Sequence, residues 1–287
     1  MLVNCNQRES VDVAEHKKET EFWHVQRLNK LKAPDGWLNL AGLFWLKSGE
    51  NSFGSGVTND LVFPKGKIPE KSGVIVLKDG EVSVFPAKGI ELLLSGNHFE
   101  GGKIYPLDSG TVVYLSHQSL RFTIIRRNER FGVRLRDDDM LLEKSLEGLQ
   151  RYPIDIEFRA EATLIGGTEN DSIDITNVLG QQIRQKSGGR FSFKLFEMDF
   201  ELTTIDEGTS ELFIVFGDKT TGKGTYGGGR FLYIPKPDQN GKTIIDFNRA
   251  INPPCVFTEF ATCPLPPAYN KLALAIEAGE KDYHQKE

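Results

Sequence analysis

Apolar residues recur at every third position among charged residues near the start of the chain. These residues are Phe22, Val25, Leu28 and Leu31. Such spacing is typical of an amphipathic helix, whose apolar side chains gather on one face. Pro34-Asp35-Gly36 follows and ends such a helix. The pattern therefore predicts a helix over residues 14–33.

After this helix the pattern changes to short apolar runs separated by Gly, Asp and Asn. The runs are rich in Val, Ile, Phe, Leu and Tyr, which favours strands. A first series comprises Gly73–Leu77, Glu81–Phe85, Thr111–Leu115 and Leu120–Arg126. A second series comprises Ile154–Leu164, Arg190–Phe196, Asp199–Asp206, Glu211–Phe216, Arg230–Ile234, Thr243–Asn248 and Leu272–Ile276. Lys78-Asp79-Gly80 separates the first two runs and predicts a β-hairpin.

The two series predict a mainly β fold, with an N-terminal helix, a sandwich-like first β unit and a second antiparallel β unit. The expected order is a flexible tail over residues 1–13, the helix over 14–33, the first β unit over 35–136, a connector over 137–152 and the second β unit over 153–281. The connector is charged and contains leucines, which favours a short helix. The second unit includes a proline-rich loop over residues 252–267.

The composition narrows the choice of partners. Of the 287 residues, 39% are hydrophobic, enough for an ordinary core. The 35 basic and 40 acidic residues give a net charge of -5 without a long basic block, which argues against a nucleic-acid partner. No apolar run approaches the ~20 residues that a membrane-spanning helix needs.

Cys5 stands where a short apolar start meets a polar stretch. The segment Met1-Leu2-Val3-Asn4-Cys5-Asn6-Gln7 resembles the end of a bacterial lipoprotein signal, which implies that Cys5 is the lipid-bearing residue. Contact with a membrane is then expected only through this lipid anchor. The alternative is that Cys5 is an ordinary residue of the tail.

Four segments carry a resemblance to a known family. They are Asp35–Leu46, Asp246–Cys255, Thr262–Pro267 and Ile276–Lys281. With them, the chain resembles the bacterial and archaeal family named only as domain of unknown function 1684, from about Trp23 to Lys281. The resemblance implies a family but no activity, because the family is uncharacterised.

The first half of the chain also has a spacing of residues similar to that of forkhead-associated β-sandwiches. It lies in Gly49–Gly54, Asn59–Pro64 and Leu107–Gly110. Such domains recognise phosphothreonine through an Arg soon after the Gly and a Ser-x-x-His further on. Ser55 follows Gly54 here, and residues 65–73 contain no Ser-x-x-His. The resemblance implies the scaffold without its phosphopeptide chemistry.

The segment Gly217–Gly224 nearly spells a phosphate-binding loop after a strand. That motif needs a Ser or Thr after the Lys, and a helix whose N-terminus faces the phosphates. Gly224 fills the Ser or Thr position, and Gly227-Gly228-Gly229 continues into a further strand. The segment therefore predicts a β-turn.

Cys255 and Cys263 are eight positions apart, with prolines adjoining both. A zinc site needs further ligands in matching pairs, and no second Cys or His pair accompanies them. The sequence thus predicts no metal and no cofactor. In an oxidising envelope the pair is expected to close a short disulfide, whereas in the cytoplasm both would be small buried thiols.

The best candidate ligand site is a set of polar residues around the proline-rich loop. It comprises Arg230, Asp246, Asn248, Arg249, Asn252 and Glu277. On a strand, Asp246 and Asn248 point to the same face and can converge on one ligand or one loop. Arginine offers planar, bidentate donors to a carboxylate or phosphate. The alternative is a structural role, in which Asp246 and an arginine anchor the proline-rich loop by buried hydrogen bonds.

Two functions therefore stay open. The first is a non-catalytic binding or structural module of the bacterial cell envelope or periplasm, with the cytoplasm as the alternative location. The second is a hydrolase acting on a small anionic substrate held by Arg230 or Arg249, with Asp246 or Glu277 as acid or base. A filled, fully hydrogen-bonded cluster favours the module, and a cleft with a perturbed carboxylate favours the enzyme.

Overall fold

The computed structural model describes residues 12–107, 112–127, 129–140, 149–167 and 171–283. In these residues the chain is mainly antiparallel β-structure with an N-terminal α-helix, as the sequence predicts. It divides into two compact units. The sandwich unit comprises Lys32–Ser145 and Thr258–Ala261, and the α1 unit comprises the rest of the chain. None of the described helices is long and apolar enough to cross a membrane.

The sandwich unit consists of two sheets around one core. The first sheet has the strand order β1 (Leu40–Trp45), β11 (Arg130–Asp137), β10 (Leu120–Arg127), β9 (Leu115–His117), β6 (Leu93–Leu94) and β7 (Asn97–His98). The second has the order β3 (Leu61–Val62), β2 (Gly49–Gly54), β4 (Gly73–Lys78), β5 (Glu81–Pro86) and β8 (Gly102–Tyr105). Phe53, Phe63 and Phe122 contact one another in the core between them.

The hairpin predicted at Lys78-Asp79-Gly80 is confirmed. Lys78 pairs with Glu81, so Asp79 and Gly80 form the two-residue turn between β4 and β5. Both have positive φ, at 52° and 80°. Two such residues in succession give the turn whose twist matches that of the strands.

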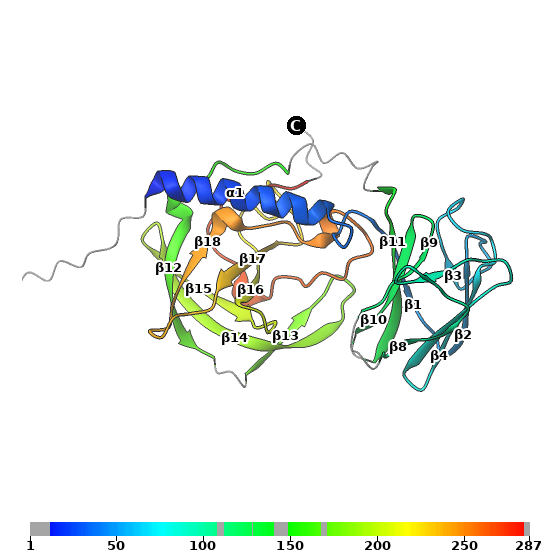
Figure 1. Cartoon of the computed structure of the whole chain (residues 1–287). Helices are drawn as coiled ribbons and strands as arrows, with labels where there is room; N and C mark the ends of the chain where they lie inside the picture. The colour runs from blue at the N-terminus through cyan, green and yellow to red at the C-terminus, as the bar shows by residue number, and fades with distance from the viewer. Residues whose placement is uncertain (1–11, 108–111, 128, 141–148, 168–170, 284–287) are drawn as a thin grey trace, which may run out of the picture. The chain divides into compact units, whose positions relative to one another are not determined.

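The α1 unit contains one antiparallel sheet of seven strands. Its order is β17 (Arg230–Pro235), β16 (Glu211–Phe216), β15 (Met198–Ile205), β14 (Gln182–Leu195), β12 (Arg159–Gly166) and β18 (Lys242–Asp246), and β13 (Ser172–Thr176) pairs with β14. The sheet is strongly curved, with α1 (Val13–Lys32) lying along its open side (Figure 1). Its core contains Phe191, Phe216 and Phe247.

Short 3-10 turns shape the rest of this unit and of the proline-rich loop. They are η1 (Ile156–Phe158), η2 (Phe247–Arg249), η3 (Pro254–Val256) and η4 (Ala268–Asn270). Three predicted strands change accordingly. The run Ile154–Leu164 is a strand only from Arg159, because η1 precedes it. The run Thr243–Asn248 is a strand only to Asp246, because the Asp246 side chain caps η2. The run Leu272–Ile276 forms no strand, and its Ile276 N–H bonds instead to the Asp218 side chain.

Some predictions fall partly outside the described residues. Residues 141–148 of the expected connector are among these, so its predicted helix stays a prediction. In the run Thr111–Leu115, residue 111 is outside, and strand β9 starts only at Leu115.

Helix α1 forms where it is predicted, and Leu31 of the predicted apolar stripe is buried, but the prediction that Phe22 and Val25 face the core is wrong. Phe22 and Val25 are 66% and 55% exposed. The buried helix residues are His16, Thr20, His24 and Leu31. This stripe is mostly polar because α1 packs on backbone carbonyls and carboxylates that need hydrogen-bond donors.

Candidate functional site

Arg230 starts β17 and is fully buried, and its partner is Asp218. The sequence places Arg230 in one group with Asp246, Asn248 and Arg249, and the structure corrects this grouping for Arg230. Arg230 Nη2 donates to Asp218 Oδ2 at 2.8 Å, and both side chains are 0% exposed. The cause is strand pairing, because Phe216 at the end of β16 lies opposite Arg230. Asp218 follows Phe216 by two residues and so comes within reach.

The Asp218 carboxylate is saturated with donors. Its Oδ1 accepts from the Thr220 backbone N–H at 2.7 Å, the Thr220 hydroxyl at 2.6 Å and the Ile276 N–H at 3.2 Å. Arg230 also donates to the carbonyls of Ile276 and Ala278. Burial lowers the pKa of Arg230, and the Asp218 charge opposes that shift. The pair therefore ties the turn after β16 to the C-terminal segment.

Asp246, Asn248 and Arg249 do lie together, at the end of β18 under α1. Asp246 Oδ1 accepts from the backbone N–H and the amide of Asn248, at 3.1 and 2.9 Å. Its Oδ2 accepts from His16 Nε2 of the helix at 2.8 Å and lies 3.7 Å from Arg249 Nε. His24 Nε2 donates to the Asn248 carbonyl at 2.9 Å. The cluster therefore fastens α1 to the sheet.

Asn252 belongs to a third group, centred on the buried Glu280. The Asn252 N–H donates to Glu280 Oε2 at 2.6 Å, and Arg27 of α1 donates to Glu280 Oε1 at 3.2 Å. Arg27 also donates to the Asn252 carbonyl at 3.1 Å. Burial raises the pKa of Glu280, and the Arg27 charge opposes that shift. Glu277 is exposed and forms no ion pair within the described part of the chain.

A cavity of about 410 Å³ lies next to the Asp218 turn. Its lining includes Asp218, Lys219, Thr221, Gly227, Gly228 and Lys271. The near-match to a phosphate-binding loop is a series of turns without a following helix, so the predicted turn is confirmed. Lys219 and Lys271 were not among the predicted site residues. The sequence signal for Lys219 is its place in the glycine-rich turn Gly217–Gly224.

Gly229 follows the lining residue Gly228 and occupies a position that only glycine fits. Its φ is +81°, and a Cβ atom there would lie 2.3 Å from Pro266 Cγ and 2.6 Å from the Phe216 carbonyl oxygen. A side chain at this position would push away the proline-rich segment. Gly229 therefore lets Pro266 pass close to the β16–β17 connection.

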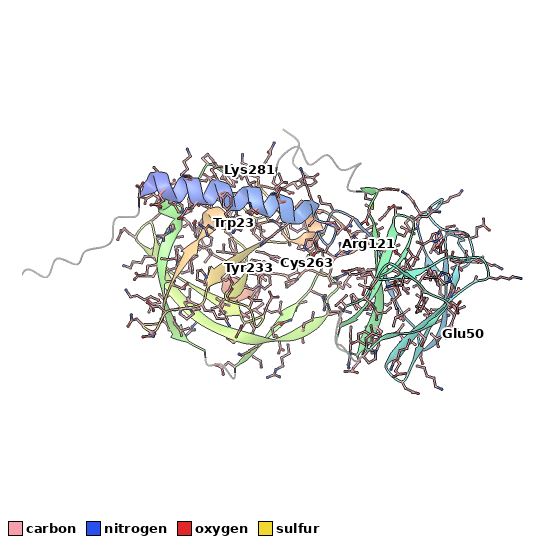
Figure 2. The ribbon with its side chains drawn as sticks, viewed as in Figure 1. Trp23, Glu50, Arg121, Tyr233, Cys263 and Lys281 are labelled. Carbon is pink, nitrogen blue, oxygen red and sulfur yellow. A yellow bond between two sulfur atoms is a disulfide. The ribbon has the colours of Figure 1, made fainter. Side chains whose placement is uncertain are left out.

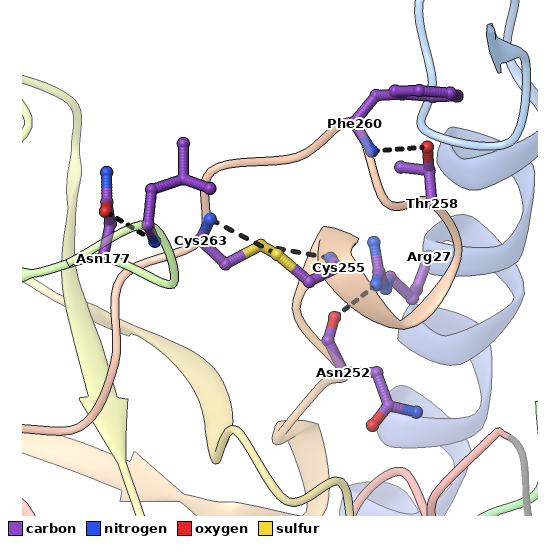
Figure 3. The surroundings of a disulfide bond; sticks show 8 residues. Arg27, Asn177, Asn252, Cys255, Thr258, Phe260 and Cys263 are labelled. Carbon is purple, nitrogen blue, oxygen red and sulfur yellow. Dashed lines mark hydrogen bonds between the residues drawn. A yellow bond between two sulfur atoms is a disulfide. The ribbon is translucent and has the colours of Figure 1, made fainter. Parts of the chain in front are cut away.

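Cys255 and Cys263 are joined by a disulfide, with their Cα atoms 6.1 Å apart (Figure 3). The Cys263 carbonyl accepts from the Val178 N–H at 2.9 Å, which ties the bridge to the loop after β13. Cys5, the predicted lipidation site, lies outside the described residues. Within the described ranges, no group of three His, Cys, Asp or Glu side chains is placed to hold a metal ion.

The chain is similar to uncharacterised proteins. Residues 144–281 match the family described as protein of unknown function (DUF1684). A solution NMR structure of an uncharacterized protein from Haloarcula marismortui is 32% identical, covers 49% of this chain and 80% of its own, and has a TM-score of 0.40. No curated protein matches.

Two further solved structures contain forkhead-associated domains or phosphopeptides by their names. The FHA domain of FhaA, complexed with an intracellular domain, is 13% identical, with 33% of this chain and 97% of that chain covered and a TM-score of 0.22. Mycobacterium tuberculosis EmbR, in complex with a low-affinity phosphopeptide, is 12% identical, with 44% and 32% covered and a TM-score of 0.22.

Proposed function

Because the chain belongs to the DUF1684 family of proteins of unknown function, we propose its function from its own site chemistry: a non-catalytic module that binds a small anion. The proposed ligand site is the cavity beside the Asp218 turn. The observation that carries the proposal is that cavity's pair of lysines, Lys219 and Lys271, which form no ion pair among the described residues.

Saturated carboxylates favour a binding module over the hydrolase. A general base needs a carboxylate oxygen within reach of the proton it abstracts. Both oxygens of Asp218, Asp246 and Glu280 already accept hydrogen bonds from buried donors. Glu277, the other predicted acid or base, is exposed and is not part of the cavity lining.

Backbone groups add to the attraction for an anion. Gly227 and Gly228 line the cavity, and within the described structure their N–H groups donate no hydrogen bond. Successive free N–H groups beside cations form a concave site for anions. The one carboxylate in the lining, Asp218, is compensated by Arg230. The local balance therefore favours a small carboxylate, sulfate or phosphate.

Lys219→Gln/Lys271→Gln should weaken anion binding by at least about tenfold, a loss of ~1.4 kcal/mol. Calorimetric titration of the full chain with phosphate, sulfate and citrate measures this loss. Lys223→Gln is the matched control, because Lys223 is exposed on the same turn but is not part of the cavity lining. Equal affinities for the double variant and the wild type, or no binding by the wild type, would refute the cavity as the site.

For location, we propose the cell envelope or periplasm. Disulfides persist in oxidising compartments and are rare in the cytoplasm. The bonded pair Cys255–Cys263 therefore supports the envelope over the cytoplasmic alternative. Alkylation of intact cells of the native host, followed by reduction and a second label, should place the second label on both cysteines. Capture of both by the first, membrane-permeant label would point to the cytoplasm.

A further inference from the structure

One face of the sandwich unit carries an unusual concentration of arginines. In β11, Val133 and Leu135 point to the core, so the alternate residues Arg134 and Arg136 point to the opposite face. The strand register adds further arginines from β10 and the hairpin end to this face. The set is Arg121, Arg127, Arg130, Arg134 and Arg136.

Arg121 and Arg136 donate hydrogen bonds to other side chains, and Arg130 lies over the Trp45 ring, 4.3 Å from the centroid. Arg121, labelled in Figure 2, donates from Nε and Nη2 to the two oxygens of Asp138, both at 2.7 Å. Arg136 donates to the Asn39 side chain at 2.7 Å and to the Gly36 carbonyl. Arg121 Nη2 also donates to the Pro34 carbonyl at 2.7 Å, so both arginines anchor the segment before β1. These bonds account for Arg121 and Arg136 as structural residues.

No hydrogen bond of this kind explains the position of Arg134. Among the residues that the structure describes, its guanidinium forms no hydrogen bond and no ion pair, and its Nε is buried without a partner. It lies over the Trp37 ring, 5.6 Å from the centroid. Burial and the charges of Arg127 and Arg136 lower the pKa of Arg134 to about 10. A partly desolvated cation beside like charges is unfavourable unless an anion joins it.

Arg127 is the neighbour that is free to share such an anion. Among the described residues, the hydrogen bond of its side chain is a 3.4 Å contact from Nη1 to the Arg126 carbonyl. It is exposed at the end of β10, opposite Arg130. In the β10–β11 register Arg127 pairs with Arg130, so it lies on the same face as Arg134 and four residues along from it. Two long side chains on one face at this spacing can reach toward one bound group.

We propose that Arg134 and Arg127 form a binding site for a phosphate dianion, either free or as a phosphate ester. The planar guanidinium fork matches phosphate oxygens, and two cations suit a doubly charged group. The Trp37 ring attracts the Arg134 cation and so favours its position before the ligand binds. This site lies in the sandwich unit and goes beyond the cavity of the α1 unit, so neither proposal depends on the other.

The test follows arginine Nε–Hε resonances of the full ¹⁵N-labelled chain in phosphate-free buffer. The background is Lys219→Gln/Lys271→Gln, which removes the cavity lysines. The Arg134 signal is assigned as the one missing from Arg134→Met. Titration with inorganic phosphate should shift this signal saturably, and an equal concentration of acetate should not. Phenyl phosphate in a parallel titration distinguishes an ester site, where it binds more tightly, from a site for the free ion.

Two variants separate this site from unspecific charge. Arg127→Gln should weaken phosphate binding by about tenfold, as expected for loss of a charge-assisted contact. Arg126→Gln is the matched control, because Arg126 is the adjacent exposed arginine and contacts Glu129; its affinity should equal that of the background.

Thermal unfolding gives an independent readout. Arg134→Met should unfold at the same or a higher temperature than the background without phosphate, because it removes an unpaired charge. It should lose the stabilisation that phosphate gives the background. An unmoved Arg134 signal, or equal destabilisation by Arg134→Met with and without phosphate, would overturn the proposal and assign Arg134 a structural role.

Discussion

Arg230→Met should lower the free energy of unfolding by about 3–5 kcal/mol, because it leaves the Asp218 carboxylate buried without its counter-charge. Both side chains are inaccessible to solvent. Methionine fills a similar space but cannot donate to Asp218 or to the carbonyls of Ile276 and Ala278. Urea denaturation followed by far-UV circular dichroism measures the change.

The matched control is Arg190→Met. Arg190 is 3.5 Å from Glu201, and both side chains are more than half exposed. Exposed pairs of this kind contribute about 0–1 kcal/mol. A second comparison is Arg230→Met/Asp218→Leu, which removes both charges and should recover part of the loss. If Arg230→Met cost no more than Arg190→Met, the buried pair would not stabilise this unit.

The partner of Arg230 could not be predicted from the sequence pattern of single strands. The runs Glu211–Phe216 and Arg230–Ile234 were both predicted as strands, and β16 and β17 occupy them. Alternation within one strand, however, says nothing of which strands pair. Antiparallel pairing of those two runs would have placed the residues after Phe216 beside Arg230. The glycines and lysine of the turn instead resemble a phosphate-binding loop, a pattern that gives Asp218 no role.

Helix α1 shows a different limit. Periodicity predicts its extent, but within the apolar stripe Phe22 and Val25 are exposed, whereas Leu31 is buried. The contacting stripe contains His16, His24 and Arg27, whose partners are 224 to 253 residues away in sequence. A local pattern cannot reveal that a distant segment presents unpaired carboxylates and carbonyls. The sequence signal for this contacting face is the four-residue spacing of His16, Thr20 and His24.

Glycines led to a third difference, in strand β14. The predicted strand starts at Arg190, whereas β14 runs from Gln182 to Leu195. Gly188 and Gly189 lie within it, where the register with β15 shifts between Ser187 and Gly189. A Cβ at Gly188 would lie 2.5 Å from Thr204 Oγ1. The glycines therefore mark a bulge inside the strand, not its start.

Asp246→Ala should destabilise the protein by about 2–4 kcal/mol and release α1 from the sheet. The change removes the acceptor of His16 Nε2 and of two Asn248 donors, all buried. Each unmatched buried donor costs about 1–3 kcal/mol. Urea denaturation measures the stability, and hydrogen exchange of the α1 amides measures the release.

Asp199→Ala is the control for this change. Asp199 is 73% exposed and lies 3.8 Å from Lys194, so its loss should cost less than about 1 kcal/mol. The ligand-site interpretation of Asp246 predicts the reverse pattern, with stability nearly intact and anion binding lost. That pattern would show that Asp246 binds a ligand instead of fastening the helix.

Acid should weaken the same attachment through His24. Burial, with the charge of Arg151 adding to it, lowers the pKa of His24 from 6.5 to about 4. Between about pH 6.5 and pH 4, His24 therefore binds a proton in the unfolded chain but not in the folded chain. The free energy of unfolding falls as the pH decreases through this range. His24→Gln retains an amide donor for the Asn248 carbonyl but does not titrate. Its stability should depend less on pH between 7 and 4, and an unchanged pH dependence would mean that another group carries the acid response.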